Sequence, residues 1–173
     1  MVLSEKFYIL VLDEIRKQPN LSKEWQSLKK AINIADISLD ILIETLKSGN
    51  LQHKLFAAGI KSIRDSNPPL ACFARDLGDW HSWKFKDKTA NYESLCRSAL
   101  LNLSWQQLDR AETKINEAKF IYDDWAYAHH LYGLLRGLQE SREGACFELN
   151  LALPRELSDV VKQRIERAIN LFS

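Results

Sequence analysis

The C-terminal half of the chain repeats itself at a spacing of 34 residues. Five residues of the segment 100–118 return unchanged in the segment 134–152. They are Leu100, Leu101, Ala111, Asn116 and Ala118, which recur as Leu134, Leu135, Ala145, Asn150 and Ala152. A period of this length is typical of stacked helix–turn–helix units, because each unit must present the same small and large residues to its neighbour. The repeat therefore predicts an all-α fold built from helix pairs.

The composition agrees with a helical, folded chain. Only 6 glycines and 4 prolines occur among 173 residues, which disfavours folds made of strands and tight turns. A net charge of +1 gives no bulk attraction to nucleic acid or to an anionic membrane, so both partners are disfavoured. No apolar run approaches the roughly 20 residues of a membrane-spanning helix, and acidic Glu5 stands where a signal peptide needs basic residues. We therefore predict a cytoplasmic protein without a membrane segment.

The apolar spacing predicts an antiparallel array of eight or nine helices, divided into three parts along the chain. Residues 1–79 should form an N-terminal helical cluster, in which the first helix runs from Ser4 to about Gln18. The stretch from Ile37 to Leu46 either continues the helix before it or forms its own. Residues 80–89 break the pattern as an aromatic and basic loop, and residues 90–173 should form helix pairs with a C-terminal capping helix. We expect one compact unit.

Several helix starts in the C-terminal half are marked by residues that cap a helix with their side chains. In chain order these are Ser104 with Gln107, Asp123 or Asp124, Ser141, and Ser158. The first pair has the spacing of a capping box, in which the serine and the glutamine each satisfy an unpaired backbone N–H.

The segment 92–159 resembles the tetratricopeptide repeat family. Small residues stand at the relative positions where helices cross in that family, with a large apolar residue between them. They are Gly133, Ala145, Leu149 and Ala152, and one period earlier Ala99, Ala111, Ile115 and Ala118. Small residues allow helices to approach closely, and the large one fills the gap beside them. The resemblance implies a protein-binding module whose first helices line a concave face.

Under this resemblance, the helix expected at about 125–138 faces the partner. Tyr127, His130 and Arg136 are its residues able to make directional contacts, whereas Leu131, Leu134 and Leu135 should be packed inside. Trp83 and Lys84 of the loop would extend the same surface, because aromatic and basic residues often anchor interfaces. We therefore predict a non-catalytic adaptor, assembly factor or regulatory subunit that binds a peptide or helix of another protein. A second copy of the chain is the alternative partner.

Two other functions have a basis in the sequence. The segment from Trp80 to Lys88 interleaves three aromatic residues with lysines, as single-stranded nucleic-acid surfaces do. We favour a loop whose rings are packed, because the chain lacks the wider basic field that such binding needs. Arg75 and His81 have a spacing similar to that of helical ribonucleases from bacterial toxin systems, where such a pair cleaves RNA without metal. An isolated pair defines no site, so we predict no enzymatic activity.

No metal or cofactor is expected. His129 and His130 are neighbours and would point about 100° apart on a helix, so they cannot ligate one ion. The cysteines form no C-x-x-C pair. Gly133 and Gly137 form a G-x-x-x-G pattern, which we expect to permit close contact between helices.

Overall fold

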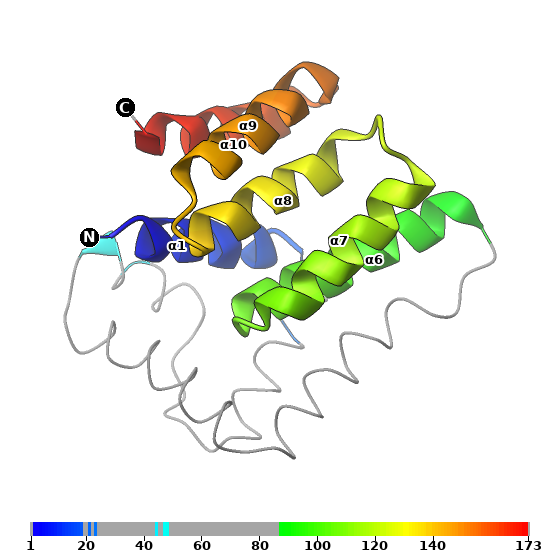
Figure 1. Ribbon diagram of the computed structural model, residues 1–173, viewed down its shortest axis with the longest axis horizontal. Helices are drawn as coiled ribbons and strands as arrows, with labels where there is room; N and C mark the ends of the chain where they lie inside the picture. The colour runs from blue at the N-terminus through cyan, green and yellow to red at the C-terminus, as the bar shows by residue number, and fades with distance from the viewer. Residues whose placement is uncertain are drawn as a thin grey trace, which may run out of the picture.

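The computed structural model describes residues 2–18, 21, 23, 44, 47, 48 and 87–172. Within these residues the fold is all-α, as predicted, with six α-helices and no strand (Figure 1). The helices are α1 (Leu3–Arg16), α6 (Lys88–Ser104), α7 (Leu108–Ile121), α8 (Ala126–Leu138), α9 (Arg142–Ala152) and α10 (Asp159–Ile169). Two short 3-10 helices, Leu153–Arg155 and Asn170–Phe172, follow α9 and α10. None of the described helices has the length and apolar character of a membrane span.

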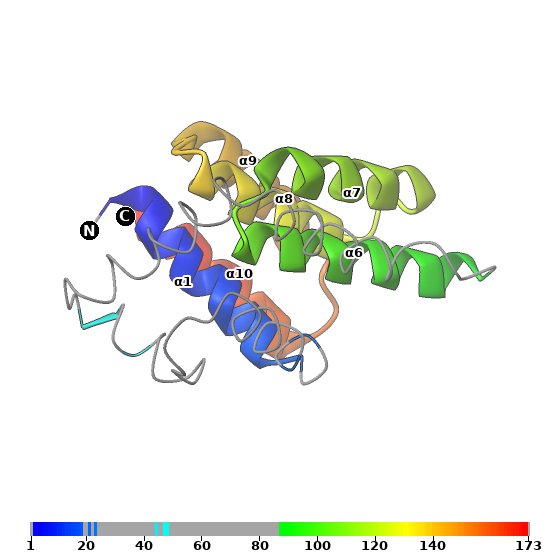
Figure 2. The same cartoon turned by 90° about the horizontal axis from the view of Figure 1, so that it is seen from below.

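Consecutive helices pack as pairs, with α6 against α7 and α8 against α9. Short turns at 105–107 and 139–141 connect the two members of each pair, so the members run in opposite directions. Figures 1 and 2 show α7 and α9 on one side of α6 and α8, and α1 on the other side. Helix α8 is central, because it contacts α1, α6, α7 and α9.

Helix α1 belongs to the same core as the C-terminal pairs. Its residues Phe7, Val11, Leu12 and Ile15 follow helical spacing and are fully buried. They join one hydrophobic cluster with residues of α6, α7, α8, α9 and α10. The first helix of the segment 1–79 therefore covers the side of α6 and α8 that faces away from α7 and α9.

The small residues that recur at the 34-residue spacing are buried, and the two glycines of α8 lie against neighbouring helices. Ala111, Ala118, Ala145 and Ala152 are all 0% exposed. A Cβ atom added at Gly133 would lie 2.6 Å from Cγ of Leu149 on α9, and one added at Gly137 would overlap the ring of Phe7 on α1. The close helix contact predicted from the G-x-x-x-G pattern is confirmed, while the tetratricopeptide-like pairing stays a prediction.

Of the four helix caps predicted in the C-terminal half, two are confirmed and two are wrong. Ser141 accepts a hydrogen bond from the Gly144 amide at 3.3 Å, and Ser158 accepts one from the Val161 amide at 3.4 Å. Ser104 does not open a capping box, because α6 continues through it and its hydroxyl donates to the Leu101 carbonyl at 2.7 Å. A serine inside a helix can bond back to the preceding turn in this way, which the local pattern does not reveal.

The cap predicted for α8 is also wrong, since Trp125 and neither Asp123 nor Asp124 is its N-cap residue. The indole makes no capping hydrogen bond. The phenol of Tyr92 on α6 instead accepts the Ala128 amide at 2.9 Å. A side chain from another helix therefore satisfies a backbone donor at the start of α8.

Candidate functional site

The predicted binding residues Tyr127 and Arg136 lie on opposite sides of α8. Nine positions separate them, and a rotation of about 100° per residue places them about 180° apart. Tyr127 faces α1, where its hydroxyl donates to Oε2 of Glu14 at 3.1 Å. Arg136 faces α7, where its guanidinium donates to Oε1 of Glu112 at 3.1 Å. These residues therefore do not form a single surface.

The other residues predicted for function lie outside the described residues. They are Trp83 and Lys84 of the binding surface, and Arg75 and His81 of the ribonuclease alternative. Of the segment from Trp80 to Lys88, only residues 87 and 88 are described. The surface extension, the nuclease and the single-strand binding site therefore stay predictions.

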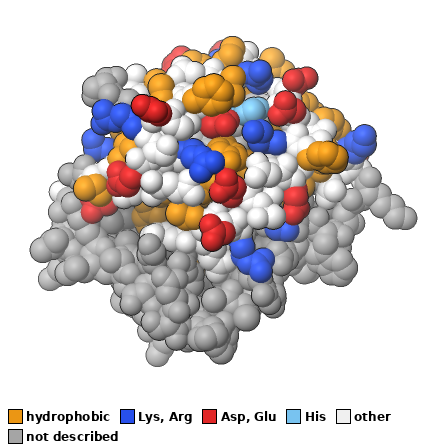
Figure 3. Space-filling view, viewed as in Figure 1, with side chains coloured by type: hydrophobic (Ala, Val, Ile, Leu, Met, Phe, Trp, Pro, Cys, Tyr) orange, Lys and Arg blue, Asp and Glu red, His pale blue; other side chains and the backbone are white. Residues whose placement is uncertain are grey.

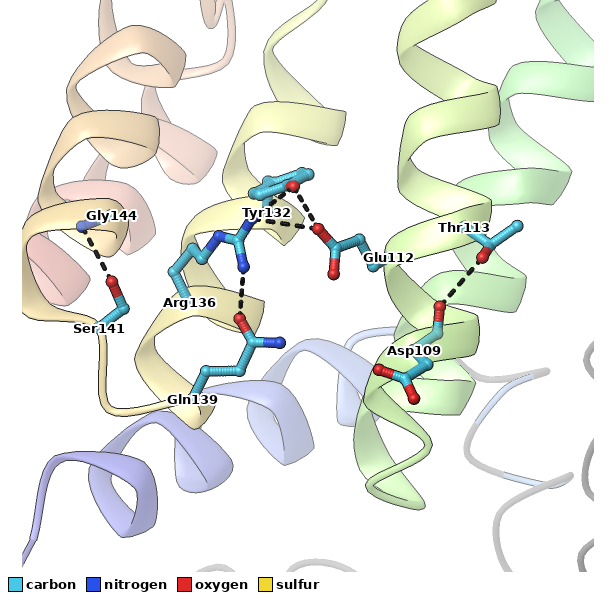
Figure 4. A network of polar contacts seen from close by, with 8 residues as sticks. All are labelled: Asp109, Glu112, Thr113, Tyr132, Arg136, Gln139, Ser141 and Gly144. Carbon is cyan, nitrogen blue, oxygen red and sulfur yellow. Dashed lines mark hydrogen bonds and ion pairs between the residues drawn. The ribbon is translucent and has the colours of Figure 1, made fainter.

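Arg136 is fixed within a polar network that joins the two helix pairs (Figure 4). Its guanidinium donates to the Tyr132 hydroxyl at 2.7 Å and to Oε1 of Gln139 at 2.7 Å. Tyr132 in turn donates to Glu112 on α7 at 2.6 Å. The hydrogen bond from Arg136 to Glu112 holds α8 against α7. Because the guanidinium already donates three hydrogen bonds within the chain, few of its N–H groups remain for a binding partner.

Tyr127 and His130 contact each other in a polar cluster between α1, α8 and α10. Their rings are 5.7 Å apart and nearly perpendicular. Glu14 is 4% exposed, and its carboxylate pairs with Nε of Arg164 on α10 at 2.6 Å. His130 is 1% exposed, so its ring serves the packing of α1 and α10 against α8.

A hollow of about 360 Å³ opens between α6 and the start of α8, beside the end of α1. It lies on the same side of α6 and α8 as α1, next to the part of these helices that α1 covers. Its lining comprises Gln18, Tyr92, Glu93, Cys96, Arg97, Trp125 and Tyr127. Sites for small ligands and side chains begin at about this volume and share its aromatic character.

The aromatic walls of the hollow are held rigidly. The ring of Trp125 stacks on Tyr122 with centroids 4.2 Å apart and an angle of 11° between the planes. Tyr92 stands nearly perpendicular to the indole at 4.9 Å. Trp125 is nevertheless 39% exposed, so part of this large ring is available to a ligand. Offset and edge-on contacts of this kind fix the rings before anything binds.

The chemistry of the hollow is that of a binding surface. Burial raises the pKa of the Cys96 thiol to about 12, so the thiol is protonated and acts as a small apolar group. Burial, with the nearby Glu14 charge second, raises the pKa of Tyr127, whose phenol stays neutral. Glu93 and Arg97 lie one turn apart on α6 and place one charge of each sign at the hollow.

Comparison with protein families, curated proteins and solved structures found no match for this chain. The function proposed below therefore rests on the geometry of the site.

Sequence reasoning missed Tyr92 and Trp125, the two residues that shape the hollow. The sequence patterns assign a role to neither residue, and the two positions appear only as the first residues of the ranges 125–138 and 92–159. The signal available was the density of aromatic residues around the turn before α8, where Tyr122, Trp125 and Tyr127 fall within six positions. Their partner on α6 could not be found from local spacing.

The pKa values of the two adjacent histidines of α8 are shifted in opposite directions. Nδ1 of His129 is 2.9 Å from Oε2 of Glu148, and Nε2 is 2.8 Å from the Asp123 carbonyl oxygen. Both partners are acceptors, so both ring nitrogens must carry protons; these hydrogen bonds, with that to Glu148 first, raise the pKa of His129. Nδ1 of His130 has no hydrogen-bond partner among the described residues, and burial lowers the pKa of this residue.

We expect the two histidines to give the unfolding free energy opposite slopes around pH 6.5, the ordinary pKa of the unfolded side chain. The stabilising contribution of His129 to the free energy of unfolding is complete below pH 6.5, and it is lost as the pH rises through the higher pKa of the folded state. The contribution of neutral His130 is complete above pH 6.5 and is lost as the pH falls toward its lower folded pKa. Urea unfolding between pH 5 and 8 measures both.

His129→Gln should flatten the slope above pH 6.5, and His130→Gln should remove part of the slope below it. Each variant serves as the control for the other. An unchanged slope above pH 6.5 in His129→Gln would show that His129 is not charged in the folded protein.

Proposed function

We propose that this chain is a non-catalytic protein–protein interaction module, an adaptor, assembly factor or regulatory subunit, and that its partner binds at the hollow between α6 and α8. The observation that carries the proposal is the hollow itself, walled by Tyr92, Trp125 and Tyr127. Interface anchors are enriched in tryptophan, tyrosine and arginine, and all three residue types line this site. The tetratricopeptide-like arrangement stays part of this proposal.

The placement of the hollow supports a protein partner. Stacked helix pairs present a continuous face of their inner helices, and such faces bind peptides. Here α1 packs on the inner helices α6 and α8. The hollow lies on the same face, beside Gln18, which follows the last residue of α1 by two positions. A segment of a partner can therefore contact the part of this face next to the end of α1.

The charge distribution supports the same class of partner. On the face of α7, α8 and α9, acidic, basic and hydrophobic side chains alternate without a field of one sign (Figure 3). Nucleic-acid surfaces instead concentrate lysine and arginine along the path of the phosphates. This face lies away from the hollow. At the hollow itself, the lining offers one acidic and one basic side chain, Glu93 and Arg97, which together with the net charge of +1 favours protein over nucleic acid.

We expect Trp125→Ala to weaken binding of the natural partner by at least about tenfold, because it removes the largest exposed ring of the hollow. The partner is first captured with the full chain from the host cell and identified by mass spectrometry. Its affinity for the wild-type chain and for the variant is then measured by calorimetry. Circular dichroism verifies that the helices are retained.

Phe120→Ala is the matched control, since Phe120 is 93% exposed on α7 and does not line the hollow. It should leave the affinity unchanged. Tyr127→Phe keeps the ring but removes the hydroxyl bonded to Glu14, so it should change affinity little. Full-strength binding by a folded Trp125→Ala variant would show that the partner does not use this hollow.

A further inference from the structure

We infer that the hollow between α6 and α8 receives a proline-rich segment of the partner in extended form. This inference rests on the proposed function and adds the chemistry of the bound segment. Three features carry it: the shape of the hollow, the flat aromatic walls, and the balance of hydrogen-bonding groups in its lining.

The shape favours an extended segment over a helix. A helix with its side chains is about 10–12 Å wide and needs an apolar groove several turns long. The hollow measures about 360 Å³ and is bounded by the end of α1, by one face of α6 and by the start of α8. It therefore accommodates a few residues of an extended chain, which rises about 3.1 Å per residue in the polyproline conformation.

The walls favour flat apolar rings. Trp125 stacks on Tyr122 through one face and meets Tyr92 almost at a right angle. Together with Tyr127 these residues form rigid aromatic surfaces around the opening. Proline-rich segments bind to aromatic-lined grooves of this kind, because their backbone is already ordered and little entropy is lost.

The hydrogen-bonding groups favour a ligand that offers acceptors. The guanidinium of Arg97 on α6 and the indole N–H of Trp125 have no hydrogen-bond partner among the described residues. They line the hollow from different elements, Arg97 from α6 and Trp125 from the N-cap position of α8. A run of prolines has carbonyl oxygens and no N–H groups, so its backbone matches both donors and leaves no donor of its own unpaired.

The charges argue against a cationic ligand. A methylated ammonium group would be attracted by the rings and by Glu93. The positive charge of Arg97 lies in the same lining and opposes it. A neutral segment avoids this repulsion, because Glu93 and Arg97 balance each other among the described residues of the lining.

The test is calorimetric titration of the full chain with an acetylated and amidated hexaproline peptide. We expect saturable binding that weakens at least about tenfold in Trp125→Ala and severalfold in Arg97→Met. Phe120→Ala should bind as the wild type does, because Phe120 lies away from the hollow. A glycine–serine hexapeptide, and the same peptide carrying one trimethyllysine, are the comparison ligands.

Absence of saturable hexaproline binding would overturn the inference, as would tighter binding of the trimethyllysine peptide. Equal binding of hexaproline by a folded Trp125→Ala variant would also overturn it. If the natural partner needs Trp125 but hexaproline does not bind, the proposed function stands and the inference about proline fails. If neither ligand depends on Trp125, both fail.

Discussion

Replacing Gly137 by alanine is expected to destabilise the protein by about 2–3 kcal/mol, although alanine is the better helix former. Propensity alone would predict a gain of about 1 kcal/mol at this position inside α8. The added methyl group would overlap the ring of Phe7, which is 0% exposed in the core between α1 and α8. Because the ring is enclosed, either α1 or α8 must shift, and this cost exceeds the gain in propensity.

A double-mutant cycle with Phe7→Leu isolates this contact. If the overlap with the ring is the cause, Gly137→Ala should cost much less in the Phe7→Leu background than in the wild type. Urea unfolding monitored by circular dichroism gives the four free energies. A Gly137→Ala variant as stable as the wild type, or more stable, would show that α1 does not pack on α8 at this glycine.

The local parts of this structure could be predicted because their causes are local. The alanines at 111, 118, 145 and 152, which recur at the 34-residue spacing, are buried, as a pattern of small residues at helical spacing predicts. The caps at Ser141 and Ser158 were found because a cap and its amide lie three residues apart.

The contacts that shape the candidate site and hold α1 to α10 join residues far apart in the chain. Tyr92 reaches the Ala128 amide across 36 positions, and Glu14 reaches Arg164 across 150. Apolar periodicity shows which side of a helix is buried, but it does not identify the helix that covers it. For this reason the sequence singled out Tyr127 and His130 but gave no sign that α1 packs against their side of α8.

The free energy lost on breaking an ion pair should differ sharply between two Glu–Arg pairs of the described helices, Glu14 with Arg164 and Glu112 with Arg136. Glu14→Gln is expected to destabilise the protein by about 3–5 kcal/mol, because it leaves the guanidinium of Arg164 without its counter-charge in a buried site. The side chains of this pair are 4% and 18% exposed, and Lys17 and Arg167 add further positive charge beside it. Glutamine keeps the shape of the side chain, so the loss measures charge and not volume.

The pair of Glu112 with Arg136 is the matched control, since each side chain is 30% exposed. Water and salt screen such a pair, so Glu112→Gln should cost about 1 kcal/mol or less. Adding Arg164→Met to Glu14→Gln should recover much of the lost stability, because an apolar side chain can replace a buried ion pair at little cost. Unfolding free energies in urea at low and high salt measure all three effects. Equal losses of unfolding free energy in Glu14→Gln and Glu112→Gln would mean that burial does not determine the cost of breaking an ion pair here. They would also mean that the Glu14 carboxylate does not hold α10 against α1.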